Sequence, residues 1–132
     1  MIQKGADIID VGGESTRPGS KTIDSKVEWK RLKFVVKNFK KKFKKTCLSI
    51  DTRKSDVMIK GIQFGADIIN DVSGFNFDKN SLVKTKKYNI AKVLHHMQGT
   101  PNTMQNNPKY KNVLLDIYDF FGENISKNLY SL

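Results

Sequence analysis

Gly5-Ala6-Asp7-Ile8-Ile9-Asp10-Val11 is repeated, nearly unchanged, as Gly65-Ala66-Asp67-Ile68-Ile69-Asn70-Asp71-Val72. Each copy has a short β-branched run after a glycine, which is typical of a strand buried on both faces in a parallel sheet. Two further apolar runs, 47–51 and 90–95, have the same character. We therefore predict four strands, of which the first and the third belong to equivalent structural units.

Segments of helical period alternate with these strands. The first helix is predicted to begin with a capping-box pair, Ser25 and Glu28, and to bury one apolar stripe. That stripe consists of Val27, Trp29, Leu32, Val35, Val36, Phe39 and Phe43. Further helices are predicted over 55–65, over 81–88 and from about 112 to the end. Such alternation predicts an α/β protein with a parallel sheet, and no linker divides residues 1–132.

The composition is that of a globular protein with a basic surface. The 132 residues carry a formal net charge of +11, and 24 residues are Lys or Arg. Only Arg17, Arg31 and Arg53 among them are arginine. Because nucleic-acid sites that read sequence rely on arginine and on interleaved aromatic residues, we expect a general basic surface and no specific nucleic-acid partner.

The single cysteine and the lack of long apolar runs bear on the compartment. Cys47 has no second cysteine to pair with and lies in a predicted buried strand. A reducing, cytoplasmic setting is therefore expected. No stretch is apolar over the length of a membrane span, and the first residues lack the pattern of a signal peptide, so no membrane association is expected.

Polar side chains end the predicted strands, where ligands bind in parallel α/β folds. Asp51 and Asn70 together offer a carboxylate, an amide donor and an amide acceptor, which is what in-plane recognition of a flat heterocycle such as a pterin requires. The alternative is that Asp51 caps the following helix and Asn70 bonds a neighbouring loop. Asp10 and Asp71 are expected to have structural roles.

The loop 12–19 holds three glycines, a proline, two hydroxyl groups and an arginine between a strand and a helix. Its glycines allow close backbone approach, and Ser15, Thr16 and Arg17 can bind phosphate or carboxylate oxygens. The spacing fits neither a Walker loop nor a dinucleotide loop. An ordinary surface loop is the alternative.

No catalytic residue is assigned from the pattern. His95 and His96 are adjacent, so on a strand they point to opposite faces and cannot ligate one metal ion together. No Ser-His-Asp or Cys-His arrangement is recognisable, and Cys47 is expected to be a packing residue.

Four strings, IIDVGGESTRPG, SIDTRK, GADIINDVSG and HMQGTPNTMQ, resemble in this order the strand ends of dihydropteroate synthase. The resemblance covers essentially the whole chain. It implies a (β/α)8 TIM barrel, present as about four consecutive βα units, so that residues 1–132 form a single partial pterin-binding domain. It also implies a transferase of folate biosynthesis, which condenses (7,8-dihydropterin-6-yl)methyl diphosphate with 4-aminobenzoate to give 7,8-dihydropteroate and diphosphate.

The resemblance further implies roles for individual residues. Asp51 and Asn70 would hold the pterin, and Thr16 would contact the pterin diphosphate. Ser15, Arg17 and Pro18 would bind 4-aminobenzoate and close the site. The family uses Mg²⁺ and forms homodimers at full length.

The sequence also departs from the family pattern. The segments that carry the magnesium ligand and the diphosphate-binding residues have no counterpart in it, and His95 stands where the family commonly has Met. We therefore expect a fragment, with no metal ligand of its own, that is weakly active or inactive alone. The alternatives are a non-enzymatic basic module that binds nucleic acid or an acidic partner, and a decayed relic.

Overall fold

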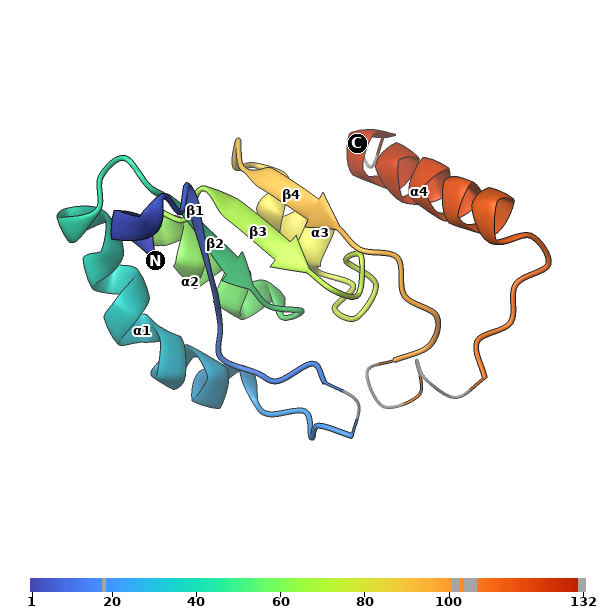
Figure 1. The fold of residues 1–132 in the computed structure, drawn as a ribbon, viewed down its shortest axis with the longest axis horizontal. Helices are drawn as coiled ribbons and strands as arrows, with labels where there is room; N and C mark the ends of the chain where they lie inside the picture. The colour runs from blue at the N-terminus through green and yellow to red at the C-terminus, as the bar shows by residue number, and fades with distance from the viewer. Residues whose placement is uncertain (18, 101–102, 104–106, 131–132) are drawn as a thin grey trace.

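A computed structural model describes residues 1–17, 19–100, 103 and 107–130. Strands and helices alternate along it after a short 3-10 helix (Figure 1). The elements are η1 Ile2–Lys4, β1 Ile8–Gly12, α1 Ser25–Lys42, β2 Cys47–Asp51, α2 Ser55–Gln63, β3 Ile68–Asp71, α3 Ser81–Thr85, β4 Ala91–Leu94 and α4 Val113–Tyr130. The predicted alternation of strands and helices is confirmed.

The strands form one parallel sheet in the order β1-β2-β3-β4. Chain order and spatial order coincide, as in consecutive βα units of a (β/α)8 barrel. The register aligns Gly12, Asp51, Asn70 and Val93 in one row across the sheet. The predicted strand ends therefore meet at one edge of the sheet.

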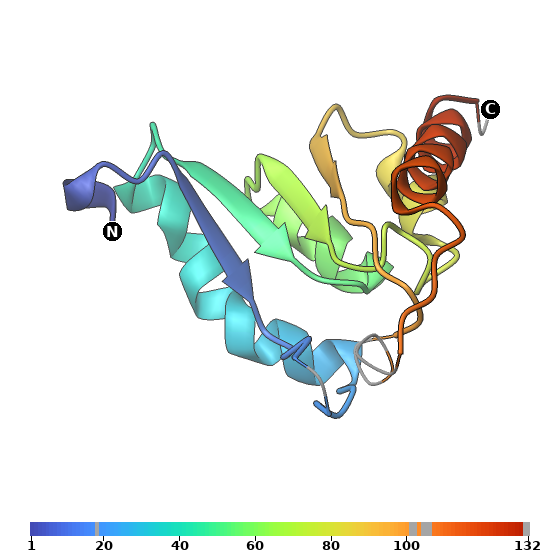
Figure 2. The same ribbon diagram turned by 45° about the vertical axis from the view of Figure 1, so that its right-hand side comes forward.

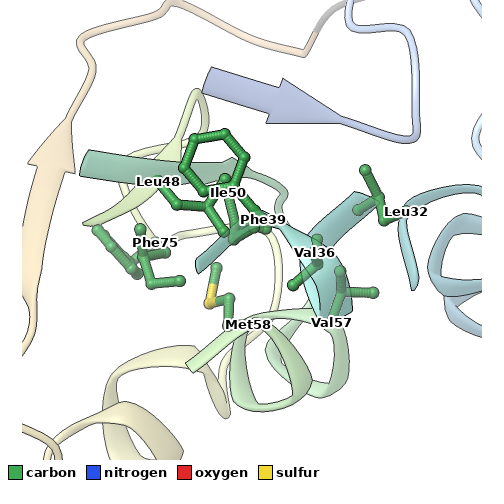
Figure 3. Packing of buried hydrophobic residues seen from close by; sticks show 9 residues of the cluster. Leu32, Val36, Phe39, Leu48, Ile50, Val57, Met58 and Phe75 are labelled. Carbon is green, nitrogen blue, oxygen red and sulfur yellow. The ribbon is translucent and has the colours of Figure 1, made fainter. Parts of the chain in front are cut away.

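The two faces of the sheet differ in what covers them. Leu48 and Ile50 are fully buried, and they point toward the helices because side chains alternate along a strand (Figure 3). Ile69, the register partner of Ile50 in β3, is fully buried as well. The helices contribute Leu32, Val36 and Phe39 from α1, and Val57 and Met58 from α2. The side chains in between lie on the opposite face, which we call the inner face. It carries Ile8, Asp10, Ser49, Asp51, Asn70 and Val93.

In the structure, the two copies of the sequence repeat lead into their strands through the same kind of backbone turn. Gly5 follows η1 and Gly65 follows α2, and both adopt a left-handed backbone, with φ of 89° and 92°. Such a conformation is strained for residues with a Cβ atom, so each glycine allows the chain to turn from a helix into a strand. The repeated strands, β1 and β3, are not adjacent, because β2 lies between them.

The predicted capping box at the beginning of α1 is wrong. The N-cap is Asp24, whose Oδ1 accepts a hydrogen bond of 2.7 Å from the backbone N–H of Lys26. Glu28 instead points inward, where its carboxylate meets the ammonium group of Lys54. The apolar stripe is also narrower than predicted, since Val27 and Val35 are 44% and 45% exposed.

The two later helices differ from their predictions in extent or burial. Helix α3 ends at Thr85, three residues before the predicted end, and the hydroxyl of Thr85 bonds back to the carbonyl of Ser81. Helix α4 begins near its predicted start, after Asn112, whose side chain accepts from two backbone N–H groups. Two of its apolar side chains, Leu114 and Ile125, are exposed.

Gly61 and Gly122 give a matched test of the packing between α2 and the sheet. A Cβ atom on Gly61 would lie 2.8 Å from Cγ1 of Ile50, whereas one on Gly122 would meet nothing within 4 Å. We expect Gly61→Ala to lower the free energy of unfolding by about 1–2 kcal/mol, because overpacking outweighs the gain in helix propensity. Gly122→Ala should raise it by about 0.5–1 kcal/mol. Urea unfolding measures both, and equal stabilisation by the two would contradict the packing.

Candidate functional site

Polar side chains of β1, β2 and β3 gather on the inner face at the carboxyl ends of the strands. Asp51 and Asn70 are partners in the parallel register, so their side chains lie side by side. The amide nitrogen of Asn70 lies 3.4 Å from Oδ2 of Asp10, and its amide oxygen lies 2.9 Å from Nε2 of His95. The predicted pairing of Asp51 with Asn70 is thus present, with Asp10 and His95 flanking it.

Asp51 does not cap α2. The N-cap of that helix is Lys54, and the backbone N–H of Lys54 is bonded to the hydroxyl of Thr52. Asn70 bonds the side chain of Asp10 in β1 and that of His95, the first residue after β4. The alternative, capping interpretation of Asp51 is therefore wrong, and its carboxylate remains directed at the inner face.

The environment of Asp51 disfavours its charged form. Burial is the main reason that the pKa of Asp51 is raised to about 6, and the carboxylates of Asp10 and Asp71 add to the effect while His95 opposes it. A buried carboxylate without a paired cation costs free energy. N–H donors of a ligand would recover that cost, so the site is suited to a donor-rich heterocycle.

Asp10 and Asp71 have different roles. Asp71 is fully buried on the helix side of β3, and its Oδ1 accepts from the backbone N–H and the hydroxyl of Ser73. Burial raises the pKa of Asp71. Its structural role was expected. Asp10 departs from the expectation, because it lies on the inner face beside Asn70.

The loop after β1 lies at the same end of the sheet as these side chains, and so does the segment after β4 (Figure 1, Figure 2). Within the loop, the hydroxyl of Ser20 donates to the carbonyl of Ser15 at 2.6 Å. Thr16 is partly buried, whereas Ser15 and Arg17 are exposed. Pro18, the remaining predicted residue, lies outside the described residues.

Four charged residues to which the sequence analysis assigned no site role form a buried ion cluster at the base of this loop. Oε2 of Glu14 lies 2.7 Å from Nη2 of Arg53, and Oε1 of Glu14 lies 2.9 Å from Nζ of Lys54. The same ammonium group lies 2.7 Å from Oε2 of Glu28. A signal existed in the sequence, since two cations directly follow a strand end and two acids precede them without an obvious partner.

The cluster keeps Glu14 ionised. Burial alone would raise the pKa of Glu14, but hydrogen bonds from Lys54, from Arg53 and from the backbone of Ile23 together lower it. Arg53 also lies over the ring of Phe77, with its Cζ 4.2 Å from the ring centroid. With two acids and two bases, the buried ion cluster is formally neutral, which makes its burial tolerable.

His96 has an aromatic neighbour, and the described part of the chain holds no candidate metal site. His96 packs edge-to-face on Phe120 at 4.9 Å, whereas Nε2 of His95 lies 2.9 Å from the amide oxygen of Asn70. Both histidines follow β4, which ends at Leu94 and is shorter than the predicted strand 90–95. Among the described residues no group of three His, Cys, Asp or Glu side chains could hold a metal ion. None of the described helices combines the length and the apolar character needed to cross a membrane.

A parallel sheet with polar side chains at the carboxyl ends of its strands, next to a glycine-rich loop, defines a ligand-binding part of a (β/α)8 barrel. The chain belongs to the pterin binding enzyme family, whose model matches residues 1–128.

Two kinds of relatives agree with this membership. Dihydropteroate synthase of Escherichia coli is 39% identical over 127 residues, which cover 96% of this chain and 44% of that protein. The crystal structure of Yersinia pestis dihydropteroate synthase in a sulfonamide drug complex superimposes with a TM-score of 0.92 at 35% identity, covering 97% of this chain and 46% of the other. The enzyme of Clostridium difficile, crystallised in the presence of pteroic acid, gives 0.85 at 36% identity and covers the same shares. The chain thus spans less than half the length of these relatives.

The raised pKa of Asp51 predicts a stabilising substitution. Because the folded-state pKa of about 6 lies above the ordinary value of 3.8, ionised Asp51 destabilises the folded chain as the pH rises from about 4 to 6. Asp51→Asn should raise the free energy of unfolding by about 1–2 kcal/mol at pH 8, after allowance for partial solvent screening. The gain should vanish below about pH 4.

Urea unfolding at a series of pH values measures this effect. Asp7→Asn, at an exposed position, is the matched control and should change stability little at any pH. A gain that is independent of pH, or an equal gain in the control, would show that the charge of Asp51 is not its cause.

Proposed function

We propose that the chain contributes the pterin-binding side of a dihydropteroate synthase. The reaction condenses (7,8-dihydropterin-6-yl)methyl diphosphate with 4-aminobenzoate and releases diphosphate. One observation carries the proposal: Asp51 and Asn70 lie side by side on the inner face of a chain that belongs to the pterin binding enzyme family. The similar enzyme crystallised in the presence of pteroic acid supports the class of ligand.

The pterin would lie against the row formed by Asp51 and Asn70. A carboxylate accepts two N–H donors in one plane, which suits a ring N–H beside an exocyclic amine, and the amide of Asn70 completes the edge. Binding would also relieve the unpaired burial of Asp51, since the ligand supplies the donors that the protein does not. The carboxylate of Asp10, when ionised, can only accept, so it favours the amide nitrogen of Asn70 on its side and leaves the amide oxygen toward Nε2 of His95.

The loop after β1 would serve the other parts of the substrates. The hydroxyl of Thr16 would donate to the diphosphate of the pterin substrate. Ser15, Arg17 and Pro18 would line the 4-aminobenzoate site, where the guanidinium of Arg17 is suited to the carboxylate. The basic net charge of the chain favours the approach of both anionic substrates.

The reaction requires the protein to position the two substrates and to stabilise charge, and it requires no nucleophile from the protein. Diphosphate leaves the methylene carbon with the bonding electron pair, and the pterin ring delocalises the resulting cation. The amine of 4-aminobenzoate then forms the new carbon–nitrogen bond and loses a proton. Asp51 would stabilise the cationic pterin, while the loop holds the amine in line with the departing group.

Mg²⁺ would assist the departure of diphosphate, and no residue of this chain is proposed as its ligand. The described part of the chain offers no group of three His, Cys, Asp or Glu side chains that could hold it. A cytoplasmic setting and a homodimer of the full-length protein stay predictions. Membership of the enzyme family disfavours a basic module without catalytic function.

Pterin binding tests the proposal directly. We expect 6-hydroxymethylpterin to bind the chain, and Asn70→Ala to weaken that binding at least tenfold because a buried ligand edge loses its partner. Asn38→Ala, on an exposed face of α1, is the matched control and should bind as the unaltered chain does. Isothermal titration provides the affinities. Absence of pterin binding, or equal affinities in Asn70→Ala and Asn38→Ala, would contradict the proposal.

Turnover of the isolated chain is a separate prediction. We expect a rate below about 1% of that of the full-length Escherichia coli relative, because losing several positioning interactions costs more than 2.7 kcal/mol, or about a hundredfold. Release of diphosphate from the two substrates with Mg²⁺ present measures the rate. A rate comparable to that of the relative would show that the chain suffices alone.

A further inference from the structure

Glu14 connects three segments through one carboxylate. Its Oε1 accepts from the backbone N–H of Ile23 at 2.9 Å and lies 2.9 Å from Nζ of Lys54. Its Oε2 accepts from Nε and Nη2 of Arg53 at 3.2 and 2.7 Å. The side chain is only 3% exposed. The carboxylate therefore joins the beginning and the end of one loop to the segment that follows β2.

These contacts divide the loop after β1 into a fixed base and a tip. Residues 14 and 23 meet through the carboxylate, so the two ends of the segment between them are held at one point. The base is held a second time, because Nη1 of Arg31 donates to the carbonyl of Gly13 at 2.9 Å. A Cβ atom on Gly13 would lie 2.8 Å from the carbonyl oxygen of Glu28, so the chain runs close against α1 there.

The partners of Glu14 are tied to the candidate site by sequence. Arg53 and Lys54 follow Asp51 by two and three residues. The backbone N–H of Thr52, the residue between Asp51 and Arg53, donates to the carbonyl of Asn70 at 3.0 Å. Thr16 follows Glu14 by two residues on the other side. The ion pairs thus set the spacing between the loop tip and the row of Asp51 and Asn70.

We propose that Glu14 is a positioning residue, which fixes the loop tip over the pterin-binding row so that Ser15, Thr16 and Arg17 meet their substrates. This inference rests on the proposed function and extends it to a residue outside the predicted site. A carboxylate that binds a backbone N–H and two cations at once has a directional role that an apolar side chain of equal volume cannot reproduce.

Amide hydrogen exchange tests the positioning without any ligand. In Glu14→Gln, the amide has one acceptor oxygen for three former partners, so the Ile23 amide and those of residues 15–17 and 19–22 should exchange at least tenfold faster. The amides of Leu48 and Ile50, in the buried sheet, should change less than twofold. Asp56→Asn, which breaks the exposed pair with Lys84, is the control and should leave the loop as it is.

A ligand measurement separates positioning from general stability. With 6-hydroxymethylpterin and inorganic diphosphate saturating, Glu14→Gln should weaken 4-aminobenzoate binding at least tenfold, because that ligand needs the loop. The affinity for 6-hydroxymethylpterin alone, which needs Asp51 and Asn70, should stay within twofold. An unchanged loop exchange rate, or equal losses for both ligands, would overturn the inference.

A second variant guards against a folding defect. If Glu14→Gln does not fold, the double variant Glu14→Gln with Arg53→Met restores the charge balance of the buried ion cluster and leaves the ion pair of Lys54 with Glu28 intact. It should fold and still show the fast loop exchange; failure to fold would mean that Glu14 acts through stability and would overturn the inference. If the unaltered chain binds no pterin, the proposed function fails, and the exchange measurement alone decides the role of Glu14.

Discussion

The alternation of side chains along β2 is the constraint on which the rest of the structure depends. Leu48 and Ile50 are fully buried beneath the helices, so Ser49 and Asp51 must face the other way. A shift of one residue would place a carboxylate in the apolar core and two aliphatic side chains on the open face. Burial of the core therefore determines that the strand ends with an acid on the inner face.

The same constraint explains why charge and apolar surface occur together there. Val93 is 40% exposed on the inner face, in the same row as Asp51, whose pKa is raised to about 6. Exposed aliphatic side chains and an unpaired carboxylate each cost free energy in an open sheet. Both costs fall when a flat, donor-rich ligand covers the row. The inner face is thus less stable uncovered than covered, as a binding surface must be.

Two solutions to burying charge stand next to each other in this molecule. Asp51 is left without a cation and has a raised pKa, whereas Glu14, only one strand away, is given two cations and has a lowered pKa. The unpaired acid is available to a ligand, and the paired acid is committed to holding the loop. Residue type alone did not separate the two; the surroundings, which come from α1, α2 and two loops, did.

The sequence by itself determined the parallel βα architecture, the strand that each repeat forms, and the pairing of Asp51 with Asn70. These follow from local periodicity and from the fact that parallel strands end at one edge. Only the tertiary structure decided that Asn70 bonds Asp10 across the inner face and that Glu14, Glu28, Arg53 and Lys54 meet. The physical reason is that those contacts join residues up to 60 positions apart. The sequence shows that a residue is charged, but not which oppositely charged residue will be buried beside it.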